Sequence, residues 1–294
     1  MKKRIKITCI ILLSLFMLPC CSMIDFSEDC TYTGNVEVRF DWSNLLEGDK
    51  VPEWIDTRFY GQSTPLLNYK LSGDTLLSGI PAERFEITAF NPIKGLDYTG
   101  LENIQTAKAQ LPVSEKDGKL YTVQAPLLYA AKTDIQVQPY TSTICELAPK
   151  SCIRQVFIDF IIINEGFDSN VESISGELSG VATVYSFAEM EAIRSSAILP
   201  FTSRKITDNN YLAELRVFGM NPNEEGFAEI PKDLKLSVCM EDKRIFSESF
   251  NLTEVFKDFR SASMYLTLEI RLTAMGIKIS ITDWYTVDQG IIEL

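Results

Sequence analysis

Alternation of apolar and polar residues predicts that this chain is built mainly from β-strands. Over residues 35–42, Val36, Val38, Phe40 and Trp42 share one face while polar residues occupy the other. A period of two is typical of a half-buried strand. Similar runs predict further strands at residues 85–90, 120–123, 135–140, 234–240, 266–270 and 277–281. Short strands at this spacing, with turn residues between them, indicate antiparallel β-sandwiches.

The strongest of the strand patterns, residues 153–163, predicts a strand of a different kind. Both of its faces are nearly apolar, and the interruptions are Arg154, Gln155 and Asp159. Strands that are covered on both faces lose the simple alternation of half-buried ones. We therefore expect a central strand that is covered on both sides for much of its length.

Two short helices are predicted from their start signals. Ser186 and Asn251 each offer an N-cap oxygen, and an acidic residue follows three positions later at Glu189 and Glu254. Neither helix is long enough to organise a fold. We expect both to cover sandwich ends, so the predicted fold class is mostly β with a few short helices.

The N-terminus has the layout of a secretion signal. A basic start precedes an apolar run over residues 7–18, which ends at Pro19, Cys20 and Cys21. The run is shorter than the roughly 20 residues that a membrane-spanning helix needs. Because it ends on cysteine, it resembles a bacterial lipoprotein signal, and Cys21 is the expected lipid-modified first residue. Cys20 is the less favoured alternative, because Pro19 precedes it.

An acylated Cys21 would hold the chain on a membrane while the folded part lies outside it. Ser27, Glu28 and Asp29 follow shortly after and resemble the acidic signal that sends lipoproteins of Bacteroidetes-type bacteria to the outer face of the outer membrane. The alternative is a plain acidic linker. The expected location is the outer membrane, lipid-anchored and facing the cell exterior.

The length of the chain fits two domains of ordinary size. No fixed-period repeat and no Gly/Ser-rich or Pro-rich linker divides it, but strand patterning is interrupted between residues 140 and 153. We expect a signal peptide at residues 1–20, a linker at 21–33, an N-terminal sandwich at 34–145 and a C-terminal sandwich at 146–294.

Charge and composition exclude several functions. Removing residues 1–20 takes away four basic and no acidic side chains, which changes the net charge from −12 to −16. Nucleic acid is therefore not an expected partner. The chain has no histidine, the commonest general base and catalytic zinc ligand. We expect neither an enzyme nor a bound cofactor or metal.

Four cysteines follow Cys21, namely Cys30, Cys145, Cys152 and Cys239. An oxidising compartment permits disulfides, and a short loop could bring Cys145 to Cys152. Two free buried thiols are an equally open alternative, and the spacings do not match a zinc site. The state of the other two cysteines stays open.

The order of these segments resembles the fimbrillin-like lipoproteins of Bacteroidetes, and most closely an uncharacterised subfamily of that group. After the lipoprotein signal, the segments that carry the resemblance are residues 36–42, 153–163, 174–180, 217–219 and 279–284. The resemblance implies two tandem transthyretin-like β-sandwiches and a role in type V pili, which polymerise by strand exchange. It also implies fimbrial subunits as partners and palmitate-type lipidation.

In such pili a trypsin-like protease removes an N-terminal strand after Arg or Lys, whereas anchor subunits keep their lipid and first strand. Here Arg39 lies within the first predicted strand, where folding should shield it. Lys50 lies in a loop-like stretch, but nothing marks it as a processing site. The resemblance therefore favours a fimbrial anchor or accessory subunit, acting in pilus assembly or adhesion by β-strand complementation, over a polymerising subunit.

The alternative function is a surface glycan-binding lipoprotein of a nutrient-uptake system, with glycans or host molecules as partners. Trp54 is the candidate glycan contact, because Trp42 and Trp284 belong to strand patterns and are expected in the core. Neighbouring carboxylates, such as Glu53 with Asp56 or Glu241 with Asp242, are expected by chance in a chain with 40 acids. No catalytic pair is predicted from them.

Overall fold

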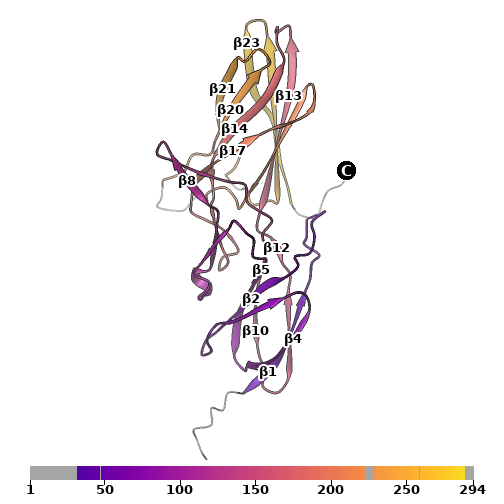
Figure 1. Ribbon diagram of the computed structural model, residues 1–294, viewed down its shortest axis with the longest axis vertical. Helices are drawn as coiled ribbons and strands as arrows, with labels where there is room; N and C mark the ends of the chain where they lie inside the picture. The colour runs from indigo at the N-terminus through magenta and orange to yellow at the C-terminus, as the bar shows by residue number, and fades with distance from the viewer. Residues whose placement is uncertain (1–31, 47, 223–227, 258, 289–294) are drawn as a thin grey trace, which may run out of the picture.

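The computed structural model describes residues 32–46, 48–222, 228–257 and 259–288 (Figure 1). The expected signal peptide, Cys21, the acidic residues Ser27 to Asp29 and Cys30 lie outside the described residues. Within the described ranges, no helix is long and apolar enough to cross a membrane.

The described chain is almost entirely β-structure, and its one helical element is the 3₁₀ turn η1 (Ile104–Thr106). The strands of the first half are β1 (Thr33–Phe40), β2 (Ile55–Gly61), β3 (Leu67–Leu71), β4 (Thr75–Pro81), β5 (Arg84–Phe90), β6 (Asp97–Thr99), β7 (Lys108–Gln110), β8 (Val113–Lys116), β9 (Lys119–Thr122), β10 (Tyr129–Gln136), β11 (Ser142–Leu147) and β12 (Lys150–Ser151). Those of the second half are β13 (Arg154–Glu165), β14 (Val171–Val181), β15 (Val184–Ser186), β16 (Glu191–Ile193), β17 (Ala197–Thr202), β18 (Arg204–Thr207), β19 (Asn210–Val217), β20 (Asp233–Met240), β21 (Ile245–Asn251), β22 (Ser263–Thr273) and β23 (Gly276–Val287).

Two sheets lie at one end of the elongated molecule and share a buried core (Figure 1). One has the order β11-β1-β4 and the other β12-β10-β5-β2-β3. Apolar side chains on alternate positions of these strands meet between them, as the two-residue period requires. We call the cluster the β1 core, and its members are Val36, Val38, Ile55, Phe59, Leu71, Leu77, Ile80, Phe85, Ile87, Ala89, Ala131, Ile135, Val137, Cys145 and Leu147.

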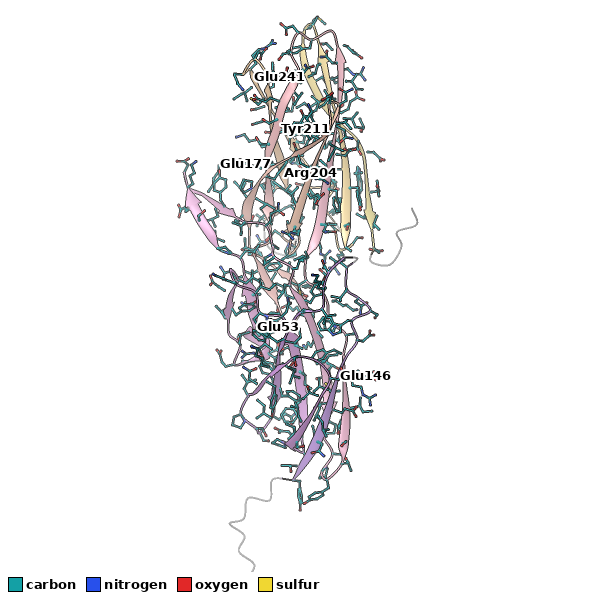
Figure 2. The ribbon with its side chains drawn as sticks, turned by 45° about the vertical axis from the view of Figure 1, so that its right-hand side comes forward. Glu53, Glu146, Glu177, Arg204, Tyr211 and Glu241 are labelled. Carbon is teal, nitrogen blue, oxygen red and sulfur yellow. The ribbon has the colours of Figure 1, made fainter. Side chains whose placement is uncertain are left out.

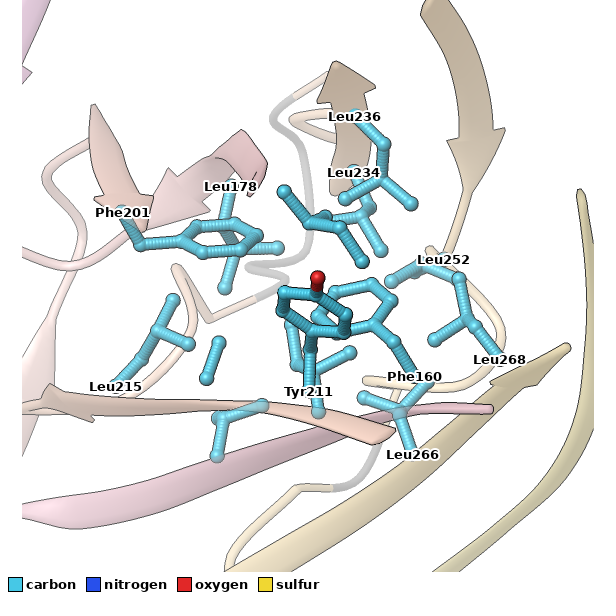
Figure 3. Packing of buried hydrophobic residues seen from close by; sticks show 14 of the residues in the cluster. Phe160, Leu178, Phe201, Tyr211, Leu215, Leu234, Leu236, Leu252, Leu266 and Leu268 are labelled. Carbon is cyan, nitrogen blue, oxygen red and sulfur yellow. The ribbon is translucent and has the colours of Figure 1, made fainter. Parts of the chain in front are cut away.

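Two further sheets form the other end, with the orders β18-β19-β13-β22-β23 and β21-β20-β14-β17-β9-β8. Their inner faces enclose the largest apolar cluster, which includes Phe160, Leu236 and Leu266 (Figure 3). The ring of Tyr211 also lies in this cluster, and its hydroxyl donates to the carbonyl of Val171 at 2.7 Å. That bond satisfies a polar group that would otherwise be costly to bury.

A small sheet of order β16-β15-β7-β6 lies between these two ends. It joins distant parts of the sequence, because Tyr185 on β15 is in register with Ala109 on β7. Phe90 stacks on Phe187 with ring centroids 4.5 Å apart, inside a third apolar cluster. Strand β17 also pairs with β9, at Ile198 and Tyr121. The two halves of the sequence are thus connected by strand pairing as well as by the chain.

The prediction of a mostly-β fold is confirmed, but the prediction of two short helices is wrong. Ser186 does accept a hydrogen bond from the backbone of Glu189, yet residues 187–190 form a turn that ends at Met190 with φ 57°. Asn251 likewise caps a turn rather than a helix. A single helical turn is an unfavourable nucleus, and neither sequence continues far enough to extend it.

The sheets are also not purely antiparallel. Strand β1 pairs in parallel with β11, β13 with β22, and β17 with β9. The strand expected at residues 135–140 is shifted, since β10 ends at Gln136 and Tyr140 has φ 59°. Most of the other predicted strands, including 35–42 and 234–240, fall within or close to observed ones.

Strand β13 is central in its sheet, but it is not covered on both faces as expected. Val156, Ile158 and Phe160 are buried against the large core. On the opposite face Phe157 is half-buried, and Ile161 is 39% exposed. The apolar residues of the second face therefore belong to a surface, and that surface borders the cleft described below.

Candidate binding surface

Strand β1 occupies the middle of its sheet. It pairs with β11 on one side and β4 on the other, and Val36 and Val38 are both 0% exposed. Beyond the valines, the backbone of Phe40 donates to the carboxylate of Asp74 at 2.9 Å. Trp42 is half-buried and stacks on Phe40, with ring centroids 5.8 Å apart. The first strand is thus held along both edges and on its inner face.

The two basic residues near this strand differ in setting. Arg39 lies inside β1, in register with Glu146 on β11, and its guanidinium pairs with Glu37 at 2.8 Å. Lys50 is exposed and lies in the segment between β1 and β2. Backbone that belongs to a paired strand is poorly accessible to a protease, whereas an exposed loop is the usual site of cleavage.

The segment after β1 is tied to the body of the protein by Tyr129. The ring of Tyr129 is buried, its hydroxyl accepts from the backbone of Leu46 at 3.4 Å, and it donates to the carboxylate of Asp49. Burial and the neighbouring Asp49 carboxylate raise the pKa of Tyr129 well above its ordinary value. The hydroxyl therefore stays protonated and holds Leu46 and Asp49 in place.

A row of aromatic side chains crosses the outer face of the sheet that contains β13. Phe157 on β13 is in register with Tyr265 on β22, and Tyr265 with Tyr285 on β23. The rings stack nearly parallel, with centroids 4.7 Å and 5.0 Å apart. Since β23 is the last strand of its sheet, the far side of Tyr285 has no neighbouring strand among the described residues, and Tyr285 is 50% exposed.

A polar row lies beside the aromatic one. It consists of three residues in register, Arg216 on β19, Gln155 on β13 and Ser263 on β22. Gln155 lies two residues before Phe157 on β13, and Ser263 lies two residues before Tyr265 on β22. Both rows face a cleft of about 730 Å³ whose opposite wall is the segment after β1, including Leu45 and Asp49. We call this space the aromatic cleft. Its size is typical of ligand-binding pockets.

Trp42 packs against the β1 core as expected, but the other two tryptophans differ from the sequence-based expectation. Trp284 was expected in the core, but it is 49% exposed because β23 is an edge strand. Trp54, the candidate glycan contact, is only partly exposed, and the ammonium of Lys70 lies 4.1 Å from its ring centroid. Its accessible ring surface is therefore limited by a cation–π contact.

The neighbouring carboxylates form no facing pair. Asp56 binds the guanidinium of Arg58 at 2.8 Å, and Asp242 binds that of Arg244. Glu53 and Glu241 lie in different halves of the molecule (Figure 2). Among the residues that the structure describes, no group of three or more metal-ligating side chains is placed to hold an ion.

Of the two arrangements that the sequence left open for Cys145 and Cys152, the structure has the free thiols and not the disulfide. Both are free and buried, Cys145 in the β1 core and Cys152 in the middle cluster beside Tyr185. Burial raises the pKa of each thiol to about 12. Cys239 is also free and half-exposed. The thiols of Cys145 and Cys152 point into separate clusters, which is why the short loop does not bring them together.

No protein-family model matches the chain, and no curated protein matches it significantly. Solved structures do match. A protein from Bacteroides ovatus that is described as an adhesin aligns with a TM-score of 0.59 at 16% identity, over 88% of this chain and 96% of that one. The fimbrial anchor protein Mfa2 from Porphyromonas gingivalis aligns with a TM-score of 0.55 at 12% identity, over 86% and 96%.

A protein from Bacteroides thetaiotaomicron that is described as polysaccharide-binding aligns with a TM-score of 0.52 at 8% identity, over 87% of this chain and 98% of that one. The chain therefore has the fold of a group of Bacteroidetes adhesins. Within that group it is similar to a fimbrial anchor, so the fimbrillin-like resemblance predicted from the sequence is confirmed at the level of the fold.

Proposed function

We propose that this chain is a lipid-anchored protein of the outer-membrane surface that serves as a fimbrial anchor or accessory subunit and keeps its first strand. The observation that carries the proposal is the position of β1 between β4 and β11, with Val36 and Val38 fully buried. The similarity to the fold of a fimbrial anchor supports it.

Removing β1 would leave two unpaired strand edges and uncover the apolar floor of the β1 core. A sheet in that state accepts a foreign strand readily, because the incoming backbone satisfies the free groups and its side chains cover the floor. A subunit that keeps β1 offers no such groove in this sheet. It can join a pilus by donating a strand to the next subunit, which is the role of an anchor or accessory subunit in assembly or adhesion.

The same proposal includes two tandem transthyretin-like sandwiches with a boundary near residue 145. The two pairs of sheets at opposite ends of the molecule support two sandwiches, and the N-terminal pair includes β11 up to Leu147 and β12 up to Ser151. It also includes Cys21 as the acylated residue and Ser27, Glu28 and Asp29 as the surface-export signal. An acylated cysteine with more than one chain would supply stable membrane attachment.

The glycan-binding alternative is favoured by a different part of the molecule than Trp54. The aromatic cleft combines ring surface with polar groups, whereas Trp54 is covered in part by Lys70. We therefore treat glycan binding as a property that an adhesive surface protein could have, and argue it separately below.

The proposal is tested by metabolic labelling of the native host with an alkyne fatty acid. Cys21→Ala should abolish the label, whereas the matched control Cys20→Ala should keep it, because alanine is also small before the cleavage site. On intact cells, replacing Ser27, Glu28 and Asp29 by alanine should reduce antibody access without removing the label. A label that persists in Cys21→Ala would contradict the proposed anchor.

A further inference from the structure

The aromatic cleft has two unlike walls. One is the outer face of the sheet, with the aromatic row and the polar row side by side. The other is the segment after β1, which Tyr129 fixes through Asp49 and the backbone of Leu46. Both walls are therefore ordered by packing and hydrogen bonds. A pre-formed cleft loses less entropy when a ligand binds than one that must first be ordered.

The chemistry of the floor is mixed in a way that suits sugars. Phe157 and Tyr265 supply apolar ring edges, and the Tyr265 hydroxyl lies at the tip of its ring. The polar row next to them supplies hydrogen-bond donors and acceptors from Gln155, Arg216 and Ser263. A pyranose carries C–H groups and hydroxyls on one ring, so it needs apolar and polar contacts close together.

The open side of Tyr285 extends this floor beyond the cleft. Its ring stacks on Tyr265 on one side only, since no strand follows β23 among the described residues. A chain of sugars that leaves the cleft along the row would meet this exposed aromatic face. Rigid aromatic side chains give large contact area at low cost in conformational entropy.

Charge limits the class of glycan. The cleft holds one guanidinium, that of Arg216, together with the carboxylates of Asp49 and Asp288. The whole chain has a net charge of −12. Sulfated or uronic-acid-rich polymers would be repelled by this balance, whereas neutral sugars would not.

We infer that the aromatic cleft binds a short segment of a neutral, pyranose-containing glycan. The inference rests on the proposed adhesive role at the cell surface and names the ligand of that role. Gln155, Arg216 and Ser263 bind the hydroxyls, Phe157 and Tyr265 form the apolar floor, and Tyr129 is a positioning residue that acts through Asp49.

The test is calorimetric titration of the full-length lipoprotein in detergent. The probes are gluco-, manno-, galacto- and xylo-oligosaccharides, with heparin as a polyanionic control. We expect at least one neutral oligosaccharide to bind and heparin not to compete with it. Absence of binding to every neutral probe would overturn the inference and leave the labelling result for Cys21 unaffected, so the two proposals fail separately.

Variants distinguish the cleft from the rest of the sheet. Gln155→Ala and Arg216→Ala should each weaken binding by about tenfold, as expected when a hydrogen-bonding group to a sugar is lost. Asp159→Ala is the matched control, because it lies on the same strand and face, two residues beyond Phe157 and outside the cleft. Tyr129→Phe should also weaken binding, although Tyr129 itself does not contact the ligand, because Asp49 would no longer be held in position.

Thermal unfolding of each variant shows whether the fold is intact. Equal affinities in Gln155→Ala, Arg216→Ala and wild type would place any observed binding elsewhere and overturn the inference. Competition of a bound oligosaccharide by an extended peptide, with no effect of Gln155→Ala, would point to strand pairing at β23 as the real interaction and would also contradict it.

Discussion

The first and last described strands of this protein have opposite surroundings. Strand β1 has neighbours on both sides, and its inner valines are fully buried. Strand β23 is longer, but it pairs only with β22 and carries exposed Trp284 and Tyr285. A strand with two neighbours cannot leave without opening its sheet, whereas an edge strand offers unpaired backbone to a partner. Strand β1 is therefore integral to its sheet, whereas β23 lies at the edge of its sheet and contributes to the surface.

A charge placed on each of the two strands should change the stability of the protein by very different amounts. Val38→Asp should cost at least about 4 kcal/mol in the free energy of unfolding, because the carboxylate would be buried without a partner. Thr286→Asp on β23 should change it by less than about 0.5 kcal/mol, since that residue is exposed. Chemical denaturation of both variants measures the difference. Similar losses in the two variants would contradict the contrast.

Cysteine reactivity reports on β1 directly, because Cys145 is in register with Val38. Burial raises the pKa of Cys145 to about 12, so its thiolate is scarce at neutral pH and iodoacetamide should modify it about a thousandfold more slowly than half-exposed Cys239. Mass spectrometry of the alkylated protein measures both rates. Rapid modification of Cys145 in the folded protein would show that β1 opens readily.

The same thiol shift predicts how stability depends on pH. A raised pKa means that the folded protein keeps a proton that the unfolded chain loses, so this contribution is complete below the ordinary thiol pKa of 9.0 and is lost as the pH rises toward 12. Stability should therefore fall through that window. Cys145→Ser should make the fall shallower in denaturation curves across the range, and an unchanged slope would contradict the assignment.

A smaller effect is expected where the chain leaves β1. Tyr129→Phe removes the hydroxyl that binds Asp49 and the backbone of Leu46, and should cost about 1–2 kcal/mol. It should also speed cleavage by added trypsin after Lys50, because the segment is no longer held. Tyr140→Phe, at an exposed turn, is the control and should change neither quantity. Unchanged cleavage in Tyr129→Phe would show that other contacts hold the segment.

In the aromatic row, the position of a residue in the sheet should decide how much stability its loss costs. Tyr265→Ala loses stacking on two sides and should cost about 2 kcal/mol, whereas Tyr285→Ala loses it on one side and should cost about 1 kcal/mol. Thermal unfolding ranks the two. An equal cost for both would mean that the end of the row is as well packed as its middle.

The sequence predicts local strands well and their neighbours poorly. Alternation identifies β1 because half-burial leaves a period of two, and it applies equally to β23. It cannot tell a central strand from an edge strand, so Trp284 is expected in the core but is exposed. The capping residues Ser186 and Asn251 predict helices that do not form, because a cap fixes one turn and does not determine whether a helix follows it.

The candidate site depends even more on tertiary structure. Phe157 and Tyr265 are more than 100 residues apart in sequence, and only the parallel pairing of β13 with β22 brings them into one row. One signal was present, since residues 153–163 are apolar on both faces. That pattern was interpreted as a doubly covered strand, but its second face forms the floor of the aromatic cleft.

Whether β1 stays in place is tested most directly by the N-terminus of the protein isolated from its native membrane, determined by mass spectrometry. We predict a chain that begins at an acylated Cys21 and still contains β1. A chain that begins at Val51, after cleavage at Lys50, or just after Arg39, would contradict it and would identify a subunit that polymerises by giving up its first strand.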